Sequence, residues 1–593
     1  MSVAITGFGI LSAIGNDASA VLSSLKAGKT GIGPMHYLQS SHKELPVGEV
    51  KLSNEEMLRM LGLDEKAIVS RTVLMGAIAI RQALEHAKID TQGKRVTVIS
   101  GTTVGGMDIT ERFFKQIKDD DALLPLLEKH DCGSSTREMA DLAGLKEAQV
   151  CTVSTACSSA VNAIILGSEM LKNNEADIVI AGGTEALSLF HLNGFNSLMI
   201  LDKEQCRPFD KNRAGLNLGE GAAFVVLQSQ PHSISPQGKR IVIRGYGNRC
   251  DAFHQTASSE NGEGAFLAMS EALQMAELQP DDIQYINAHG TGTPNNDASE
   301  SAAIRRVFGE KIPLVSSTKG FTGHTTSASG AIETVICILA LLNDFVPSNY
   351  GWKEKDEACI EPYANSKFIN SKFKISPLES ILCNSFGFGG NDSALIISKS
   401  PLPAPPLGEC LRQETCILGE CIIDNVEQLG ELREFVSAGE ARRMSKLMKA
   451  ATISSLKALR EAGIETPDAI ITATAYGMLE TSEKFLVDML ENGEETLSPT
   501  LFMQSTHNTL SSAIAIRTKC HGYNMTYSQG KDSLEWALRD ARRLIGTGKA
   551  KTVLVGYHDE ATPTFQEFFR RMGKPVPQEI YSRSIVLGAT KNA

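Results

Sequence analysis

The sequence predicts an α/β protein built from more than one domain. Short β-branched runs alternate with longer helical patterns through about the first 400 residues, and this alternation is typical of α/β folds. The chain has 593 residues, which is too long for one ordinary core. Its last 175 or so residues return to the same alternation after a proline-rich break, which indicates a separate second module.

Composition narrows the class of protein. An apolar fraction of 42% and a charged fraction of 21% are typical of a soluble globular chain. A formal net charge of −11 disfavours nucleic-acid binding, which needs a basic surface. The twelve cysteines form no CxxC pair, so we expect reduced thiols in a cytoplasmic protein, without a zinc site or a disulfide framework.

No segment predicts a membrane protein. The N-terminal stretch MSVAITGFGILSAIGNDAS lacks a positively charged start, so strand, glycine turn and helix explain it better than a signal peptide. The most apolar later stretch, residues 331–342, contains Glu333 and is too short to cross a bilayer.

The elements of the first 400 residues can be placed in order. The buried strand candidates are residues 96–100, 178–181, 222–227, 241–246 and 380–383. The helix candidates are residues 73–87, 159–172 and 264–276. Glycines follow several of these strands, as at Gly182-Gly183, where the chain turns tightly or two backbones approach closely.

The second module looks like a diverged copy of the first. It follows a linker, SKSPLPAPPLG, that the prolines make semi-rigid. Residues 444–464, 469–485 and 551–561 repeat the patterns of residues 69–89, 97–113 and 177–186, in the same order. Independent α/β periodicity in the two modules is the alternative explanation.

One cysteine has the context of a nucleophile. Cys157, in VSTACSSAVNA, ends a buried strand and immediately opens a helix. A helix N-terminus favours a thiolate, so we expect a lowered pKa at this thiol. The other eleven cysteines have contexts of ordinary packing.

Two histidines are candidate partners for that thiol. His289 lies at a strand end in NAHGTGTP, ahead of a glycine/threonine loop. His324 follows Lys319 by five residues in STKGFTGH, and a small-residue helix containing Glu333 comes next. A single histidine is usually structural, but two in glycine-flanked strand-to-loop settings point to a site.

These segments resemble the successive signatures of elongating β-ketoacyl-acyl-carrier-protein synthases. The matching segments are STACSSA, GGTEA, RPFDKNRAGLNLGEGAA, NAHGTGTP, STKGFTGHTTSASGAIE and CNSFGFGGND, in the family's order, over residues 1–400. The resemblance implies a thiolase-like fold, with layers αβαβα and two pseudo-repeated halves. We expect the halves at 1–235 and 236–398, the linker at 399–414, and a catalytically silent half-domain at 415–593.

The resemblance also implies roles for the site residues. Cys157 would accept the acyl group, and His289 and His324 would assist malonyl decarboxylation, with Lys319 and Glu333 ordering them. The backbone N–H groups of Cys157 and Phe388 would form the oxyanion hole, and Phe388 would gate the site. Thr291 and Thr293 would bind the phosphopantetheine arm. No metal or cofactor of the chain's own is expected, because the acyl carrier protein brings 4′-phosphopantetheine.

The sequence departs from the family at two positions. Ala214 replaces an aspartate, and Asn391-Asp392 replaces Thr-Asn after the double glycine. Both lie in segments that organise the acyl pocket and gate in the family, which puts any transferred chain-length preference in doubt. Basic residues for docking the carrier protein are sparse, and a solvated surface explains them equally well. The candidates are Lys66, Arg71, Arg207, Lys211 and Arg213.

The second module lacks the catalytic set. The position of Cys157 falls on Lys531 or Asp532, depending on a one-residue shift in alignment, and no counterpart of either histidine segment follows. SPTLFMQSTHNTLSSAIAI resembles truncated modules similar to chain-length factors, and His507 and Asn508 within it are expected to be structural. The module would cover the synthase surface, mimic a dimer partner or shape the acyl tunnel.

The function expected from the resemblance is decarboxylative condensation of an acyl thioester on Cys157 with malonyl-carrier protein. The pathway would be bacterial aryl-polyene, polyketide or fatty-acid synthesis, and the fused module favours the specialised pathways. We expect acyl- and malonyl-carrier proteins as partners and a homodimer or ketosynthase-type heterodimer. A non-catalytic chain-length factor or scaffold is the alternative, and a thiolase using Cys383 as its second cysteine is a third.

Overall fold

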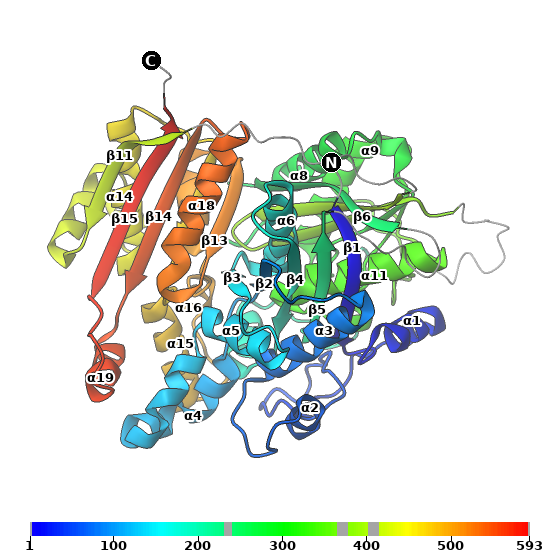
Figure 1. Ribbon diagram of the computed structural model, residues 1–593, viewed down its shortest axis with the longest axis horizontal. Coiled ribbons are helices and arrows are strands. Elements are labelled where there is room, and N and C mark those ends of the chain that lie inside the picture. Colours follow the sequence, from blue (N-terminus) through cyan, green and yellow to red (C-terminus); the bar gives the residue numbers. More distant parts are fainter. Residues whose placement is uncertain (1–2, 230–239, 365–376, 401–413, 591–593) are drawn as a thin grey trace.

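The computed structural model describes residues 3–229, 240–364, 377–400 and 414–590. All strands within these ranges join one sheet of 15 strands, in the order β11-β15-β14-β12-β13-β3-β2-β4-β5-β1-β6-β10-β9-β7-β8. The second module forms one end of this sheet, drawn in yellow, orange and red in Figure 1.

The N-terminal half of the synthase is a five-stranded block. Its strands are β1 (Val3–Ser12), β2 (Val96–Gly101), β3 (Gln149–Val153), β4 (Ile178–Glu185) and β5 (Gly221–Gln228). Helix α3 (Arg71–Ala87) packs with Val98 and Ile180 on one face, and α6 (Ser159–Lys172) packs with Ile99 and Val179 on the other. Neighbouring residues of one strand thus serve two cores, which is why these strands are continuous apolar runs.

The C-terminal half continues the sheet. Its strands are β6 (Arg240–Cys250), β7 (Tyr285–Asn287), β8 (Leu314–Ser316), β9 (Ser380–Gly387) and β10 (Asn391–Ser400). Helices α8 (Glu263–Ala276) and α9 (Pro294–Phe308) cover one face, whereas α11 (Ser329–Asn343) lies with α6 in the core of the other.

One stretch of the described residues is long and apolar enough to cross a membrane. This stretch, Thr326–Asn343, includes α11, and 89% of it is buried inside the protein. Its apolar character is that of a core helix, packed against the N-terminal half through α6.

The tail, residues 414–590, repeats the N-terminal block. Its strands are β11 (Thr415–Ile423), β12 (Ala469–Ala473), β13 (Tyr523–Tyr527), β14 (Thr552–Glu560) and β15 (Ile580–Ala589). Their order from the centre outward, β13-β12-β14-β15-β11, matches β3-β2-β4-β5-β1. Helices α14 (Lys446–Ala462) and α18 (Ser533–Gly546) take the places of α3 and α6, as the sequence repeat predicts.

The two blocks meet where β13 and β3 pair antiparallel at Tyr527 and Val153. The Ser154 N–H donates to the Thr526 carbonyl at 2.9 Å, and the Ser528 N–H donates to the Thr152 carbonyl at 3.0 Å. This reciprocal pairing relates the blocks by a local pseudo-twofold axis. The prediction that the tail packs against the synthase is confirmed.

The predicted domain boundaries stay predictions. The division between residues 235 and 236 lies in the range 230–239, and most of the linker 399–414 lies in the range 401–413. Both ranges are outside the described residues.

Candidate functional site

Cys157 lies in a sharp turn between β3 and α6. Ala156 has a φ of 51°, and a single 3₁₀ turn, Ala156–Ser158, leads into the helix. The Ser159 hydroxyl accepts the Thr155 N–H at 2.9 Å and fixes the turn. Behind it, a Cβ on Gly101 would meet the Ala160 nitrogen at 2.6 Å, so only glycine allows α6 to approach β2 this closely.

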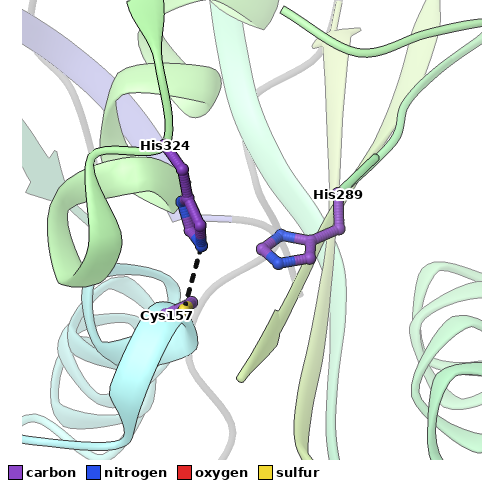
Figure 2. Close-up of side chains that lie close together, drawn as sticks. All are labelled: Cys157, His289 and His324. Carbon is purple, nitrogen blue, oxygen red and sulfur yellow. Dashed lines mark hydrogen bonds between the residues drawn. The ribbon is translucent and has the colours of Figure 1, made fainter. Parts of the chain in front are cut away.

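The structure brings both predicted histidines to this thiol (Figure 2). The His324 Nε2 lies 3.1 Å from the Cys157 Sγ, and its Nδ1 lies 2.9 Å from the Ser329 hydroxyl. The His289 ring stands edge-on to the His324 ring, with 5.3 Å between centroids. One sulfur and two imidazole nitrogens within 4.8 Å of one another could also bind a metal ion, so the expectation of a metal-free site stays untested.

Lys319 and Glu333 lie behind His289. The Lys319 ammonium contacts a Glu333 carboxylate oxygen at 2.5 Å and the His289 carbonyl at 2.6 Å, and both side chains are at most 3% exposed. The ammonium also lies 3.3 Å from the His289 Nδ1. An ammonium can only donate, so the neutral imidazole accepts at Nδ1 and carries its proton on Nε2.

Burial shifts the pKa of both histidines and of Glu333. It lowers the pKa of both histidines well below 6.5, and the Lys319 charge adds to that effect, so both rings are neutral at pH 7. It raises the pKa of Glu333 to about 7 against the attraction of Lys319.

The predicted lowering of the thiol pKa is wrong. Burial raises the pKa of Cys157 to about 12, although the Lys319 charge and the Phe388 N–H both favour the thiolate. The desolvation cost outweighs the helix N-terminus in this enclosed position. The resting nucleophile is therefore a thiol, with the His324 Nε2 placed to accept its proton.

One carboxylate at the site was missed by the sequence reasoning. Glu300, on α9, accepts the N–H groups of His289 and Gly290 at 2.9 and 2.8 Å and so fixes the loop that carries His289. Burial raises its pKa to about 7. A glutamate six residues after NAHGTGTP was the available signal.

Thr291 and Thr293 lie together in the same loop, with their hydroxyl oxygens 2.8 Å apart. Asp297, at the start of α9, accepts the Thr291 N–H at 3.0 Å. This bond fixes the backbone of the loop and leaves the two threonine hydroxyls next to each other. Neither threonine is among the residues that line the pocket at Cys157.

Phe388 lies on the opposite side of the thiol. The backbone N–H groups of Phe388 and of Cys157 itself both lower the pKa of the Cys157 thiol against the larger effect of burial, and they are the two groups expected to form the oxyanion hole. The Phe388 ring stacks on Phe195, with 5.8 Å between centroids.

A pocket of about 390 Å³ extends from Cys157 into the boundary between synthase and tail. On the synthase side it is lined by Phe388, Phe195 and residues of α4 (Met107–Asp119) and the segment after it. On the tail side it is lined by Tyr476, Phe502 and other residues up to Lys574. The tail therefore forms one wall of the pocket that reaches the thiol.

The tail residues named in the sequence are also placed. Gly530 (φ 55°) and Ser533 repeat the turn of Ala156 and Ser159, since the Ser533 hydroxyl accepts the Gln529 N–H at 2.7 Å. This geometry resolves the alignment: Lys531, not Asp532, holds the position of Cys157. His507 lines the pocket, and burial lowers its pKa to about 4.

Most of the basic docking candidates are occupied. Arg71 is buried against Glu220 at 2.6 Å, and Arg213 is buried against Asp356 at 2.5 Å. Arg207 pairs with Glu204. Lys66 and Lys211 are the two exposed candidates, and Lys211 also pairs with Glu354 at 2.6 Å. Ala214 is exposed and is not among the residues that line the pocket at Cys157.

Comparisons with known proteins agree with this geometry. Residues 1–233 and 240–353 match the family models described as the N-terminal and C-terminal domains of beta-ketoacyl synthase. Residues 425–586 match a second model of the N-terminal domain. The 3-oxoacyl-[acyl-carrier-protein] synthase 2 of Coxiella burnetii is 32% identical over 418 residues, which are 67% of this chain and 98% of that protein. The same-named protein of Staphylococcus aureus is 32% identical over 417 residues, with the same coverage.

Two solved structures are also similar. A ketosynthase (ApeO), in complex with its chain length factor (ApeC) from Xenorhabdus doucetiae, is 29% identical, with a TM-score of 0.58 over 67% of this chain and 98% of that one. A PfaC keto synthase-chain length factor aligns with 100% of this chain and 79% of its own, with a TM-score of 0.78. At 16% identity, this second likeness shows the fold alone.

Proposed function

The chain belongs to the β-ketoacyl synthase family and is a condensing acyltransferase of the 3-oxoacyl-[acyl-carrier-protein] synthase type, and from this premise we propose how its residues act. The observation that carries the proposal is the 3.1 Å contact between the Cys157 Sγ and the His324 Nε2, with His289 beside them in a buried pocket.

The first half-reaction loads Cys157. The sulfur attacks the carbonyl carbon of an acyl thioester, and the developing oxyanion receives the N–H groups of Cys157 and Phe388. The bond to the pantetheine sulfur then breaks. His324 takes the thiol proton during the attack and returns it to the departing pantetheine thiolate.

The second half-reaction uses a malonyl thioester. Its C–C bond to the carboxylate breaks, carbon dioxide leaves, and the electron pair forms an enolate whose oxygen faces the two imidazole rings. His289 donates from Nε2, the atom that its contact with Lys319 leaves protonated. The enolate carbon then attacks the acyl carbonyl, the new C–C bond forms, and the bond to the Cys157 sulfur breaks. The departing thiolate takes up one proton from solvent, which restores the resting thiol. The neutral His289 ring suits this role because it donates without attracting the malonyl carboxylate that must depart.

We assign the phosphopantetheine arm of a carrier protein to the loop of Thr291 and Thr293. The assignment is supported by the paired hydroxyls and by the position of the loop next to His289. Of the five basic candidates, Lys66 and Lys211 are the exposed ones that could meet an acidic carrier surface. The cofactor belongs to that partner, and the chain supplies only the groups that receive it.

The tail takes the place of a second subunit. This proposal is supported by the pseudo-twofold pairing of β13 with β3 and by the pocket wall that the tail contributes. The synthase then needs no other chain to enclose its acyl group. The resemblance to a ketosynthase bound to its chain length factor supports a polyketide or aryl-polyene pathway over housekeeping fatty-acid synthesis.

Neither alternative function, a chain-length factor or a thiolase, fits the residues at the site. A pure chain-length factor needs no nucleophile, yet Cys157 is fully equipped. A thiolase needs a second reactive cysteine, and Cys383 is fully buried in the core beside Cys337, away from the pocket.

Intact-mass measurement after incubation with acyl-carrier thioesters tests the proposal. We expect an acyl adduct on Cys157, lost in Cys157→Ala and kept in Cys383→Ala. Addition of malonyl-carrier protein should release a β-ketoacyl product, and a panel of saturated, unsaturated and aryl primers should identify the preferred chain. A wild-type chain that never acquires an adduct would support the scaffold reading instead.

A further inference from the structure

Four buried asparagines meet where the tail contacts the C-terminal half of the synthase. We call them the asparagine cluster: Asn248 on β6, Asn391 on β10, Asn508 just before α17 (Thr509–Thr518), and Asn524 on β13. None is more than 4% exposed. Two come from each module, so the cluster exists only in the assembled chain.

The hydrogen bonds of the cluster fix the orientation of its amides. The Asn508 Nδ2 donates to the Phe388 carbonyl at 2.8 Å and to the Asn391 Oδ1 at 2.7 Å. The Asn391 Nδ2 donates in turn to the Asn524 Oδ1 at 3.0 Å. Because the Phe388 carbonyl can only accept, the nitrogen of Asn508 must face it, and this choice propagates through the other amides.

The cluster reaches both sides of the nucleophile. On one side, Asn248 donates to Asn162 at 2.8 Å, and Asn162 donates to the Thr155 hydroxyl at 2.8 Å, two residues before Cys157. On the other side, Asn508 holds the carbonyl of Phe388. The same loop lies against the nucleophile, since a Cβ on Gly387 would meet the Cys157 nitrogen at 3.2 Å.

Two further observations connect Asn508 to the Phe388 loop. Gly389 has a φ of 86°, and a Cβ there would meet the Asn508 Nδ2 at 2.9 Å, so the loop lies directly on the tail. Asn391 is also the residue that departs from the family's threonine. A threonine hydroxyl has one donor hydrogen, whereas the Asn391 amide accepts from Asn508 and donates to both the backbone carbonyl and the Oδ1 of Asn524. The departure falls at the point where the tail meets the loop.

We propose that Asn508 is a positioning residue for the condensing reaction: it holds the Phe388 carbonyl so that the Phe388 N–H points at the reacting sulfur, which makes the tail part of the oxyanion hole's support. Asn508 does not cap α17 through its side chain, so helix capping does not explain its burial. The inference rests on the proposed function of Cys157 and Phe388, and it adds a dependence of that site on the tail.

The test uses the full chain with Asn508→Asp and Asn508→Ala, both of which remove the donor to Phe388. The first readout is alkylation of Cys157 by iodoacetamide between pH 7 and pH 9, followed by mass mapping of its peptide. A thiol that loses a well-aimed N–H should react about two- to ten-fold more slowly at each pH, the effect of one hydrogen bond on the thiolate. The second readout is acyl loading, where kcat should fall and the KM for the acyl-carrier thioester should stay unchanged.

Asn492→Asp is the matched control. Asn492 is an exposed tail residue whose amide contacts only Asp488 of its own helix, and this variant should match the wild type in both readouts. Asn391→Thr keeps the bond from Asn508 to Phe388 and removes one support, so it should give a smaller loss of the same kind. If the Asn508 variants do not fold, the alkylation rate of Asn391→Thr tests the proposal in their place.

Folded Asn508 variants that alkylate at the wild-type rate would overturn the proposal. Faster alkylation would overturn it too, because the loop would then only shield the thiol. Alkylation needs no carrier protein, so a wild-type chain that fails to condense would sink the proposed function without deciding the role of Asn508.

Discussion

The residues assigned to the reaction are almost fully buried, although they must move protons. Cys157, His289, His324, Lys319 and Glu333 are all at most 6% exposed. Burial keeps the thiol protonated and the histidines neutral, and Lys319 lies in contact with Glu333 behind them. A preorganised polar site of this kind stabilises charge that develops during the reaction without having to reorganise.

The raised pKa of Cys157 predicts the pH dependence of its alkylation. A thiol with a pKa of about 12 is almost fully protonated at pH 7, and its thiolate fraction grows as pH rises. We expect the rate with iodoacetamide to increase about tenfold per pH unit between pH 7 and pH 9, without a plateau. Stopped-time mass spectrometry of the Cys157 peptide measures this rate. A plateau near neutral pH would show that His324 or the helix N-terminus stabilises the thiolate after all.

The two histidines should separate the half-reactions. His289→Ala removes a donor to the enolate, and we expect decarboxylative condensation to fall by about 10²–10³, while acyl loading of Cys157 changes little. His324→Ala should impair both steps, because this ring also contacts the sulfur. Radiolabelled carbon dioxide release and intact-mass loading measure the two steps separately. Normal malonyl turnover in either variant would contradict the assigned role.

At the scale of elements, one glycine lies at the contact between the tail and the aromatic rings next to Phe388. A Cβ on Gly194, in α7 (Leu189–Ser197), would meet the Phe502 ring of the tail at 2.1 Å. Phe502 in turn contacts Phe195, which stacks on Phe388. A shift of Phe502 in the tail would therefore move Phe195, and through it Phe388.

Gly194→Ala should disturb this contact. We expect a loss of about 1–3 kcal/mol in stability, because the added methyl overfills a packed site, together with slower acyl loading. Phe502→Leu in the same background should recover part of both, since the smaller side chain makes room. Thermal unfolding and loading rates measure the two effects. Wild-type stability and loading in Gly194→Ala would show that the Phe502 ring can shift to accommodate the added methyl group.

Elements were predictable from sequence because their patterns are local. The strand at 178–181 and the helix at 159–172 are continuous apolar or small-residue runs, and the structure places β4 and α6 there. The contribution of Tyr476 and Phe502 to the pocket was not predictable, because it depends on how two modules dock. The pKa of Cys157 was mispredicted for a related reason: its burial depends on elements that pack over it from elsewhere in the chain.

At the scale of the whole molecule, buried charges fix the docking of the two modules. Arg543 on α18 contacts Glu175 of the synthase at 2.7 Å and Asp540 at 2.6 Å, and it is only 4% exposed in its side chain. Breaking such a pair leaves an uncompensated buried charge, which is costly even where the intact pair contributes little.

Arg543→Ala should therefore lower stability by about 3–5 kcal/mol. The neighbouring Arg542→Ala is the control, because Arg542 is exposed, and its effect should stay within about 0.5 kcal/mol. Chemical denaturation monitored by tryptophan fluorescence can follow the change, since Trp536 lies in α18. Equal effects of the two variants would show that the interface does not depend on this pair.

Deletion of residues 409–593 should uncover the edge of β3. Val153 and its neighbours would lose their backbone partners on β13, and an unpaired strand edge favours association with other chains. We expect a higher oligomer or aggregation by size-exclusion chromatography, and weaker acyl loading because the pocket loses one wall. A truncated chain that stayed a stable monomer with wild-type loading would contradict both the docking and the role of the tail.

The joining of β13 to β3 within one polypeptide also sets stoichiometry. A two-chain enzyme of this design must keep its subunits in balance and can lose its pocket wall on dilution. Here the wall is tethered to the catalytic half, and a tether gives an effective concentration that can reach about the millimolar range for short flexible connections. Each Cys157 is thus supplied with one tail at any protein concentration, and its acyl pocket should be complete as soon as the chain has folded.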